Sequence, residues 1–236
     1  MEYAELRQAA LDANLALRAH GLVALTWGNA SVADPRAGLM AIKPSGLDYA
    51  GLSAEDMAVL EIETGGVVAG GRRPSSDTPT HLEIYRGFPG VGAVVHAHSI
   101  YATAWAQLAR PLPCAGTTHA DHFCGSIPVA RPLTQAEIAD DYERACGKSV
   151  VETFQREGLD PQRVPAIFLP GHAPFVWGAT AQAAVENAVA LEIVAQMALW
   201  MSAAQTPLPE LPEPLRRKHF ERKHGPRAYY GQDRSP

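Results

Sequence analysis

The sequence predicts a mixed α/β protein in which a mainly antiparallel sheet lies between helices. Short apolar runs that end in Gly- or Pro-containing turns alternate with longer amphipathic segments. Gly65-Gly66 separates two of these runs, which is a hairpin signal. We see no internal repeat and no linker, so we expect the 236 residues to form one domain, 1–236, with a full core.

Helices are expected where apolar residues recur every three or four positions. The first is Tyr3–His20, because Gly21 suits the position after a helix end. Thr78 has the character of an N-cap with Pro79 behind it. The remaining helices are expected at Ile100–Leu108, from a Thr134–Glu137 capping box to about Glu157, and at Thr180–Ala204.

Strands are expected in the short apolar runs between these helices. They are Leu22–Thr26, Leu39–Ile42, Ala58–Thr64, Val67–Val68, Gly92–His98, Ala166–Leu169 and Phe175–Trp177. After the last helix, Pro207, Pro209, Pro212 and Pro214 break regular structure before a basic tail.

Composition favours a soluble cytoplasmic protein. Apolar residues make up 47% of the chain and charged residues 19%. The N-terminus has no signal-peptide pattern, and polar residues interrupt the longest apolar segment, Ala181–Met201, so we expect no membrane span. Three cysteines without a Cys-x-x-Cys motif suit a reducing compartment.

The net charge of −5 is unevenly distributed. Arg216–Arg227 carries a local charge of +5, so the remainder carries −10. An acidic chain gains no long-range attraction to nucleic acid, and none is expected as a partner. The basic tail is therefore expected to act locally, on a small anion or a neighbouring subunit.

Three histidines form the strongest candidate metal site. His96 and His98 leave a predicted strand on one face, and His172 lies in a later turn. Asp77 is placed to supply an oxygen or to bind an outer water. Three imidazoles with an open fourth position indicate catalytic Zn²⁺, with Mn²⁺ or Co²⁺ as alternatives. Three buried histidines bound to backbone carbonyls are the competing interpretation.

Small and hydroxylated residues at predicted strand ends could bind an anion. The pairs are Gly28-Asn29, Ser45-Gly46 and Ser75-Ser76, with Lys43 able to add charge. Taken singly, each pair is better explained as a turn. Nucleotide-binding glycine motifs are absent from the sequence, so no nucleotide cofactor is expected.

The loop Thr117–Phe123 is dense in protonatable groups. Asp121 is a candidate general base there, flanked by His119 and His122, which can shift its pKa. The alternative is that Asp121 only caps a turn.

Taken together, these segments resemble the class II aldolase/epimerase family from about Leu6 to Gln232. The matching motifs are Leu25–Asn29, Ile42–Gly46, Pro74–His81, Thr117–Asp121, Arg222–Gly225 and Tyr229–Gln232. Sister aldolases carry Glu where Asp77 stands and lack the Thr-His-Ala-Asp segment, so the epimerase branch is favoured. Departures from the pattern are Pro170, Ala173, His122 and Cys124.

The resemblance implies a three-layer α/β/α fold and a homotetramer with active sites at subunit interfaces. It implies Zn²⁺ on His96, His98 and His172, with Asp77 close by. It also implies that Asp121 and Tyr230 form an acid–base pair. Tyr230, His219 and Arg222 would reach a neighbouring subunit's site from the tail, 207–236. Substrate contacts are implied for Gly28, Asn29, Lys43, Ser45, Gly46, Ser75, Ser76, Thr117, His219 and Arg222.

The implied reaction is metal-dependent epimerisation at C4 of a pentulose 5-phosphate, L-ribulose 5-phosphate to D-xylulose 5-phosphate. The C4 proton is not acidic, so the C3–C4 bond must open by a retro-aldol step and close again on the other aldehyde face. The alternatives are an L-xylulose-5-phosphate-type epimerase or a class II aldolase acting on a phosphorylated ketose. A non-enzymatic alternative is a scaffold in which the metal only fastens subunits.

Overall fold

A seven-stranded sheet forms the centre of the protein. We describe it from a computed structural model that covers residues 3–204, 206–226 and 228–230. The strands are β1 (Asn29–Asp34), β2 (Leu39–Ile42), β3 (Ala58–Glu61), β4 (Val67–Ala69), β5 (Ala93–His96), β6 (Ala166–Phe168) and β7 (Pro174–Gly178). Their order is β4-β3-β2-β1-β5-β7-β6, and every neighbouring pair is antiparallel.

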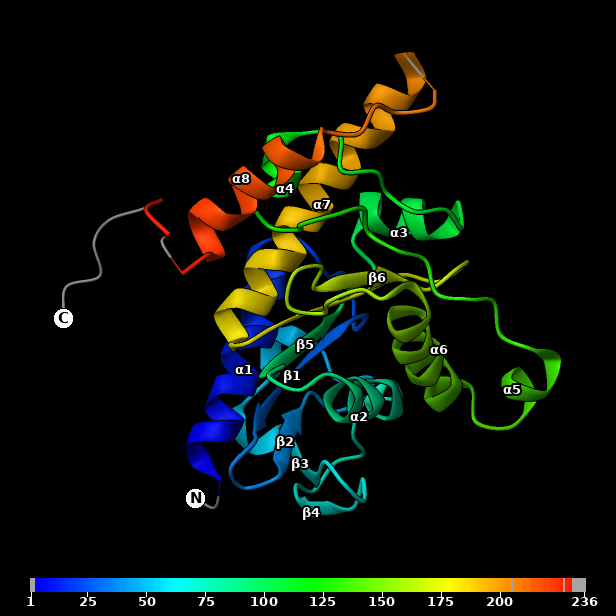
Figure 1. Cartoon of the computed structure of the whole chain (residues 1–236). Helices are drawn as coiled ribbons and strands as arrows, with labels where there is room; N and C mark the ends of the chain where they lie inside the picture. Colours follow the sequence, from blue (N-terminus) through cyan, green and yellow to red (C-terminus); the bar gives the residue numbers. More distant parts are fainter. Residues whose placement is uncertain (1–2, 205, 227, 231–236) are drawn as a thin grey trace.

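Helices cover both faces of this sheet, so the predicted α/β/α layering is confirmed (Figure 1). One face packs against α1 (Ala4–Ala19), α3 (Ile100–Gln107) and α7 (Ala181–Ala204). The other packs against α2 (Thr78–Gly87) and α6 (Tyr142–Glu157). Side chains alternate along β5 as a strand requires: Ala93 and Val95 enter the first core and Val94 the second.

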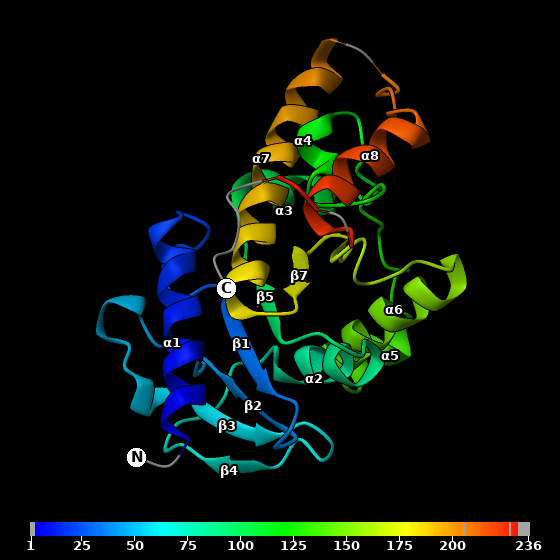
Figure 2. The same cartoon turned by 60° about the vertical axis from the view of Figure 1, so that its left-hand side comes forward.

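Short helical segments and α8 complete the described part of the fold. Tyr49–Gly51 and Ala54–Asp56 are 3₁₀ turns, and α5 spans Gln135–Ala139. The four-residue α4 (Thr117–Ala120) packs against α8 (Glu213–His224), and α4 also contacts α7 (Figure 2). Within the described residues, α7 alone is long and apolar enough to cross a membrane. One face of α7, including Leu191 and Val194, is buried in the core, whereas Ile193, Met197 and Trp200 are exposed.

The first predicted strand is wrong. Residues 22–28 contain turns and no strand, and β1 begins only at Asn29. Leu25 has a φ of 53°, which an extended strand does not allow, and its side chain is exposed. The apolar run instead forms the loop that leads to Gly28 at a φ of 77°.

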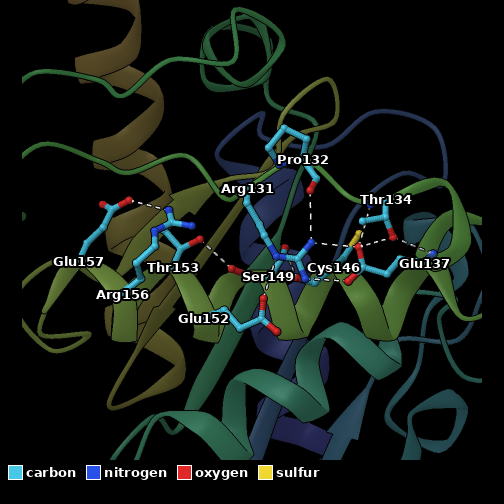
Figure 3. Close-up of polar contacts among 10 residues, drawn as sticks. All are labelled: Arg131, Pro132, Thr134, Glu137, Cys146, Ser149, Glu152, Thr153, Arg156 and Glu157. Carbon is cyan, nitrogen blue, oxygen red and sulfur yellow. Dashed lines mark hydrogen bonds and ion pairs between the residues drawn. The ribbon is translucent and has the colours of Figure 1, made fainter.

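The long helix predicted after Thr134 is two helices. Thr134 caps α5 through the predicted box with Glu137, but α5 ends at Ala139 and Asp141 caps α6 by accepting from the Arg144 amide. The guanidinium of Arg131 donates to Glu137 and Glu152, which fastens α5 to α6 (Figure 3). Two consecutive aspartates favour a cap over a helix interior, and this explains the break.

Two other element predictions need correction. Asp77, not Thr78, is the N-cap of α2, and Thr78 is its first helical residue. The sequence predicts no helix beyond Ala204 and a break in regular structure at Pro207–Pro214, yet the structure contains α8 from Glu213 to His224. Pro214 lies in the first turn of α8, where a missing amide costs no hydrogen bond. Residues 227 and 231–236 of the predicted tail lie outside the described residues.

Candidate active site

Three histidines meet at the end of the sheet. His96 is the last residue of β5, His98 follows two positions later, and His172 lies in the turn between β6 and β7. One ligand atom from each lies within 4.8 Å of the others. The Nε2 atoms of His96 and His98 are 3.2 Å apart. Tetrahedral zinc with bonds of about 2.0–2.1 Å separates its ligand nitrogens by about 3.3 Å, so the group could hold such an ion.

Contacts outside the group orient two of the three imidazoles. The Nδ1–H of His96 donates to the Pro174 carbonyl at 3.0 Å, which leaves Nε2 as a free lone pair. The Tyr142 hydroxyl lies 3.3 Å from Nδ1 of His172. Burial, with His96 and His98 nearby, lowers the pKa of His172 to about 4, and burial also lowers the pKa of His98. Both rings are therefore neutral near pH 7, which is the ligand form.

Asp77 lies beside the three histidines. Its carboxylate accepts from the Asn29 amide at 2.7 Å. Burial opposes its ionisation, but His96, His81 and the Asn29 hydrogen bond together hold its pKa below the ordinary value. Asp77 lines the same cavity as the histidines and is ionised there, although it is not part of the group within 4.8 Å.

The cavity next to the histidines has a volume of about 630 Å³. Its lining includes every residue predicted to bind an anion from the first part of the chain: Gly28, Asn29, Lys43, Ser45, Gly46, Ser75 and Ser76. Lys43 is only 1% exposed, and within the described residues no carboxylate lies within 4.0 Å of its ammonium. Burial lowers the pKa of Lys43, against a raising effect of Asp48. The pocket thus combines a candidate metal site with an unpaired cation.

A second cluster forms around Asp121, outside this cavity. The Arg222 guanidinium donates to both carboxylate oxygens at 3.0 and 2.7 Å, and His219 Nδ1 donates at 3.1 Å. Tyr230 places its ring 4.8 Å from the Arg222 guanidinium. Burial acts to raise the pKa of Asp121, but Arg222 and His219 outweigh it and hold the pKa low. Its carboxylate contacts α8 and does not cap its own turn.

The structure therefore divides the predicted site residues into two groups. None of Thr117, Asp121, His219, Arg222 and Tyr230 lines the cavity that contains the histidines. The first four come from α4, its C-cap and α8, and Tyr230 follows α8. We call this second group the α4–α8 cluster.

Several cavity residues escaped the sequence analysis. Tyr142 and Glu143 begin α6, and Trp27 lies 6.4 Å from the His98 ring. Asp140-Asp141 was the available signal for Tyr142 and Glu143, because a new helix cap would have placed the next residues at a helix start. Trp27 belongs to the matching motif Leu25–Asn29, but no residue pattern assigned its side chain to the cavity.

The α/β/α layers and the cavity with three convergent histidines are the features of a class II aldolase-type protein. The chain belongs to the family described as "Class II Aldolase and Adducin N-terminal domain", whose model matches residues 8–199. This confirms the family resemblance found in the sequence. The family is metal-dependent, and the three-histidine group is where a metal could bind here.

The chain is also similar to individual proteins of known sequence or structure. The chain is 48% identical to "L-ribulose-5-phosphate 4-epimerase UlaF" of Salmonella paratyphi C (strain RKS4594), over 97% of this chain and 99% of that protein. Among solved structures, an "L-fuculose 1-phosphate aldolase" superposes with a TM-score of 0.78 at 26% identity, covering 94% of this chain and 97% of that one. The enzyme of that name from Thermus Thermophilus gives 0.65 at 28% identity, covering 86% and 97%.

Proposed function

We propose that this protein epimerises C4 of a pentulose 5-phosphate, interconverting L-ribulose 5-phosphate and D-xylulose 5-phosphate. The observation that carries the proposal is one cavity whose lining includes three convergent imidazoles, the buried Lys43 and several serine hydroxyls. A ketose phosphate has a chelating hydroxy-ketone at one end and a dianion at the other. The 48% identity to a named 4-epimerase along nearly the whole chain supports the same assignment.

The chemistry explains why two kinds of group are required. A base takes the proton of the C4 hydroxyl, the C3–C4 bond breaks, and its electron pair remains on the three-carbon fragment as an enediolate. Glycolaldehyde phosphate turns, the bond forms again on its other face, and the C4 oxygen recovers a proton. A divalent cation on His96, His98 and His172 would act as a Lewis acid toward the developing charge. We propose Zn²⁺ as this ion, with Mn²⁺ or Co²⁺ as alternatives.

The residues of the chain then have separate tasks. Gly28, Asn29, Lys43, Ser45, Gly46, Ser75 and Ser76 are proposed to hold the substrate, so that the aldehyde fragment stays bound while it turns. Asp77, fixed by Asn29, is proposed to support the metal. Asp121 and Tyr230 are proposed as the acid–base pair on opposite faces of C4.

The residues of the α4–α8 cluster do not line the cavity of their own chain, so they can act on a substrate only in the cavity of another subunit. We therefore propose a homotetramer in which the tail, 207–236, and Asp121 complete the site of a neighbouring subunit. Thr117, His219 and Arg222 would then contact the substrate there. The supporting observation is that the cluster lies outside the cavity of its own chain. A cytoplasmic location is proposed with this function.

Mixing two inactive variants tests the shared site. His96→Ala removes a metal ligand and Asp121→Asn removes a base, so neither protein should turn over. Refolding them together should restore activity, because some interfaces combine an intact metal pocket with an intact cluster. A mixture that stays inactive, while wild-type protein refolded in parallel recovers, would contradict sites built from two subunits.

An aldolase is the second candidate, favoured by the structural similarity to L-fuculose 1-phosphate aldolases at 26–28% identity. Product analysis with purified metal-loaded protein separates the two. Inversion at C4 without released aldehyde supports the epimerase, and net glycolaldehyde phosphate supports the lyase. L-Xylulose 5-phosphate belongs in the same assay. Absence of turnover, with an assembly that dissociates under chelation, would favour the scaffold.

A further inference from the structure

Tyr49 does not line the cavity, but it contacts Lys43 and the Gly28 loop, which do. Its side chain is 2% exposed and lies in the first 3₁₀ turn, where Asp48 accepts a hydrogen bond from the Ala50 amide. The Tyr49 hydroxyl lies 3.1 Å from the carbonyl oxygen of Trp27 and 2.8 Å from that of Gly28. Burial raises the pKa of Tyr49, so the phenol keeps its proton and donates to these carbonyls.

The ring of Tyr49 faces the ammonium of Lys43. The Lys43 Nζ atom lies 4.7 Å from the ring centroid. Its other contacts are long: 3.5 Å to the Thr26 carbonyl and 3.4 Å to the Pro44 carbonyl. A buried ammonium is stabilised by an aromatic face more strongly than an exposed one. The ring therefore stabilises the Lys43 charge without neutralising it as a carboxylate would.

Gly28 in turn contacts the backbone of His96, a candidate metal ligand. A Cβ atom at Gly28 would lie 2.9 Å from the carbonyl oxygen of His96, so the two backbones are in direct contact. Tyr49 fixes the carbonyl of the same glycine by a hydrogen bond. One phenol thus connects Lys43, the Gly28 loop and the backbone of a candidate metal ligand.

We propose that Tyr49 is a positioning residue for anion binding in the cavity: its ring holds the Lys43 ammonium, and its hydroxyl fixes the Trp27–Gly28 loop. The ligand class is a phosphate monoester or inorganic phosphate. This inference rests on the proposed phosphorylated substrate. Tyr49 does not touch the substrate and acts through Lys43 and the loop.

Two variants separate the ring from the hydroxyl. Tyr49→Phe keeps the aromatic face, whereas Tyr49→Leu removes it. Tyr85→Phe is the matched control, because Tyr85 is also buried but its hydroxyl contacts Ser31 on the other side of the sheet. Binding of inorganic phosphate to the metal-loaded protein is measured by calorimetry, together with metal content and the melting temperature.

We expect Tyr49→Leu to weaken phosphate binding by about tenfold, which corresponds to about 1.4 kcal/mol for a desolvated cation–π contact. Tyr49→Phe should show a smaller loss, and Tyr85→Phe none, with metal content unchanged in all three. In turnover, Tyr49→Leu should raise KM by a larger factor than it lowers kcat.

Three outcomes would overturn the inference. One is wild-type phosphate affinity in Tyr49→Leu. Another is an equal loss in Tyr85→Phe that follows the melting temperature, since this indicates a purely structural role. The third is a wild-type protein that binds no phosphate. If phosphate binding responds as expected but no pentulose phosphate is epimerised, the proposed function fails and the role of Tyr49 stands.

Discussion

The histidine cavity and the α4–α8 cluster are built in different ways. The cavity lies at strand ends and tight turns, where hydrogen bonds of the sheet hold His96 and the Gly28 loop in place. The cluster is made by helices that pack on one another. In the cavity, Lys43 has no carboxylate partner among the described residues, whereas Asp121 is bound on both oxygens by Arg222. The cavity is therefore ready for an anion, and the cluster is already neutralised within its own chain.

The largest effect is expected in the cavity. His96→Ala removes one of three imidazoles, so bound metal should be lost and activity should fall on the order of 10³-fold or more. The cluster should be unaffected, because its contacts do not involve His96. Metal content by atomic absorption and initial rates measure both effects. His20→Ala, an exposed histidine at the end of α1, is the control. Retention of full metal content in His96→Ala would contradict the site.

A substitution in the α4–α8 cluster is expected to lower activity without loss of bound metal. Asp121→Asn should lower kcat by about 10²- to 10⁴-fold, the usual contribution of a general base, while bound metal stays unchanged. Asp12→Asn on the exposed face of α1 is the matched control. Wild-type turnover in Asp121→Asn would remove this carboxylate from the proposed chemistry. Loss of metal as well would show that the two regions are not independent.

Acid is expected to lower the stability of the folded protein through His119, which lies in α4. Burial lowers the pKa of His119 to about 4, and its Nε2–H donates to the Gly125 carbonyl at 2.8 Å. The unfolded chain takes up a proton near pH 6.5, so stability falls as pH drops from about 6.5 to about 4, by about 3 kcal/mol in all. Melting temperatures across this range, compared with His119→Gln, measure it. An equal slope in both proteins would contradict the assignment.

The smallest effect is expected away from both regions. Thr134→Ala removes the cap of α5 and should cost about 1 kcal/mol of unfolding free energy. Activity and metal content should not change, because α5 contributes no residue to the cavity or the cluster. Thr134→Ser keeps the cap and serves as control in denaturant unfolding. A loss of activity in Thr134→Ala would show that α5 supports the cavity through α6.

The sequence could group some cavity residues because they are neighbours in the chain. Adjacent or nearly adjacent residues at strand ends, such as His96 and His98, must lie together whatever the rest of the chain does. The residues missed come from backbone that the pattern misread. Tyr142 follows a helix break inside a long amphipathic segment, and Tyr49 supports the cavity through contacts that no motif encodes.

The cluster shows the limit of the same reasoning. Asp121 could be selected from its polar loop, but its pairing with Arg222 joins residues 101 positions apart in the chain. That pairing depends on α8, which proline-rich sequence concealed although Pro214 fits a first helical turn. The layered fold was predictable from alternation and turns, whereas the start of β1 was not, because the apolar pattern carries no signal for the positive φ of Leu25.

The close approach of Gly28 to the His96 carbonyl has a consequence for the residue at position 28. A side chain there would meet this carbonyl oxygen at 2.9 Å and would have to push the strand end that carries His96 out of place. The placement of a candidate metal ligand thus depends on the absence of one carbon atom from a neighbouring loop.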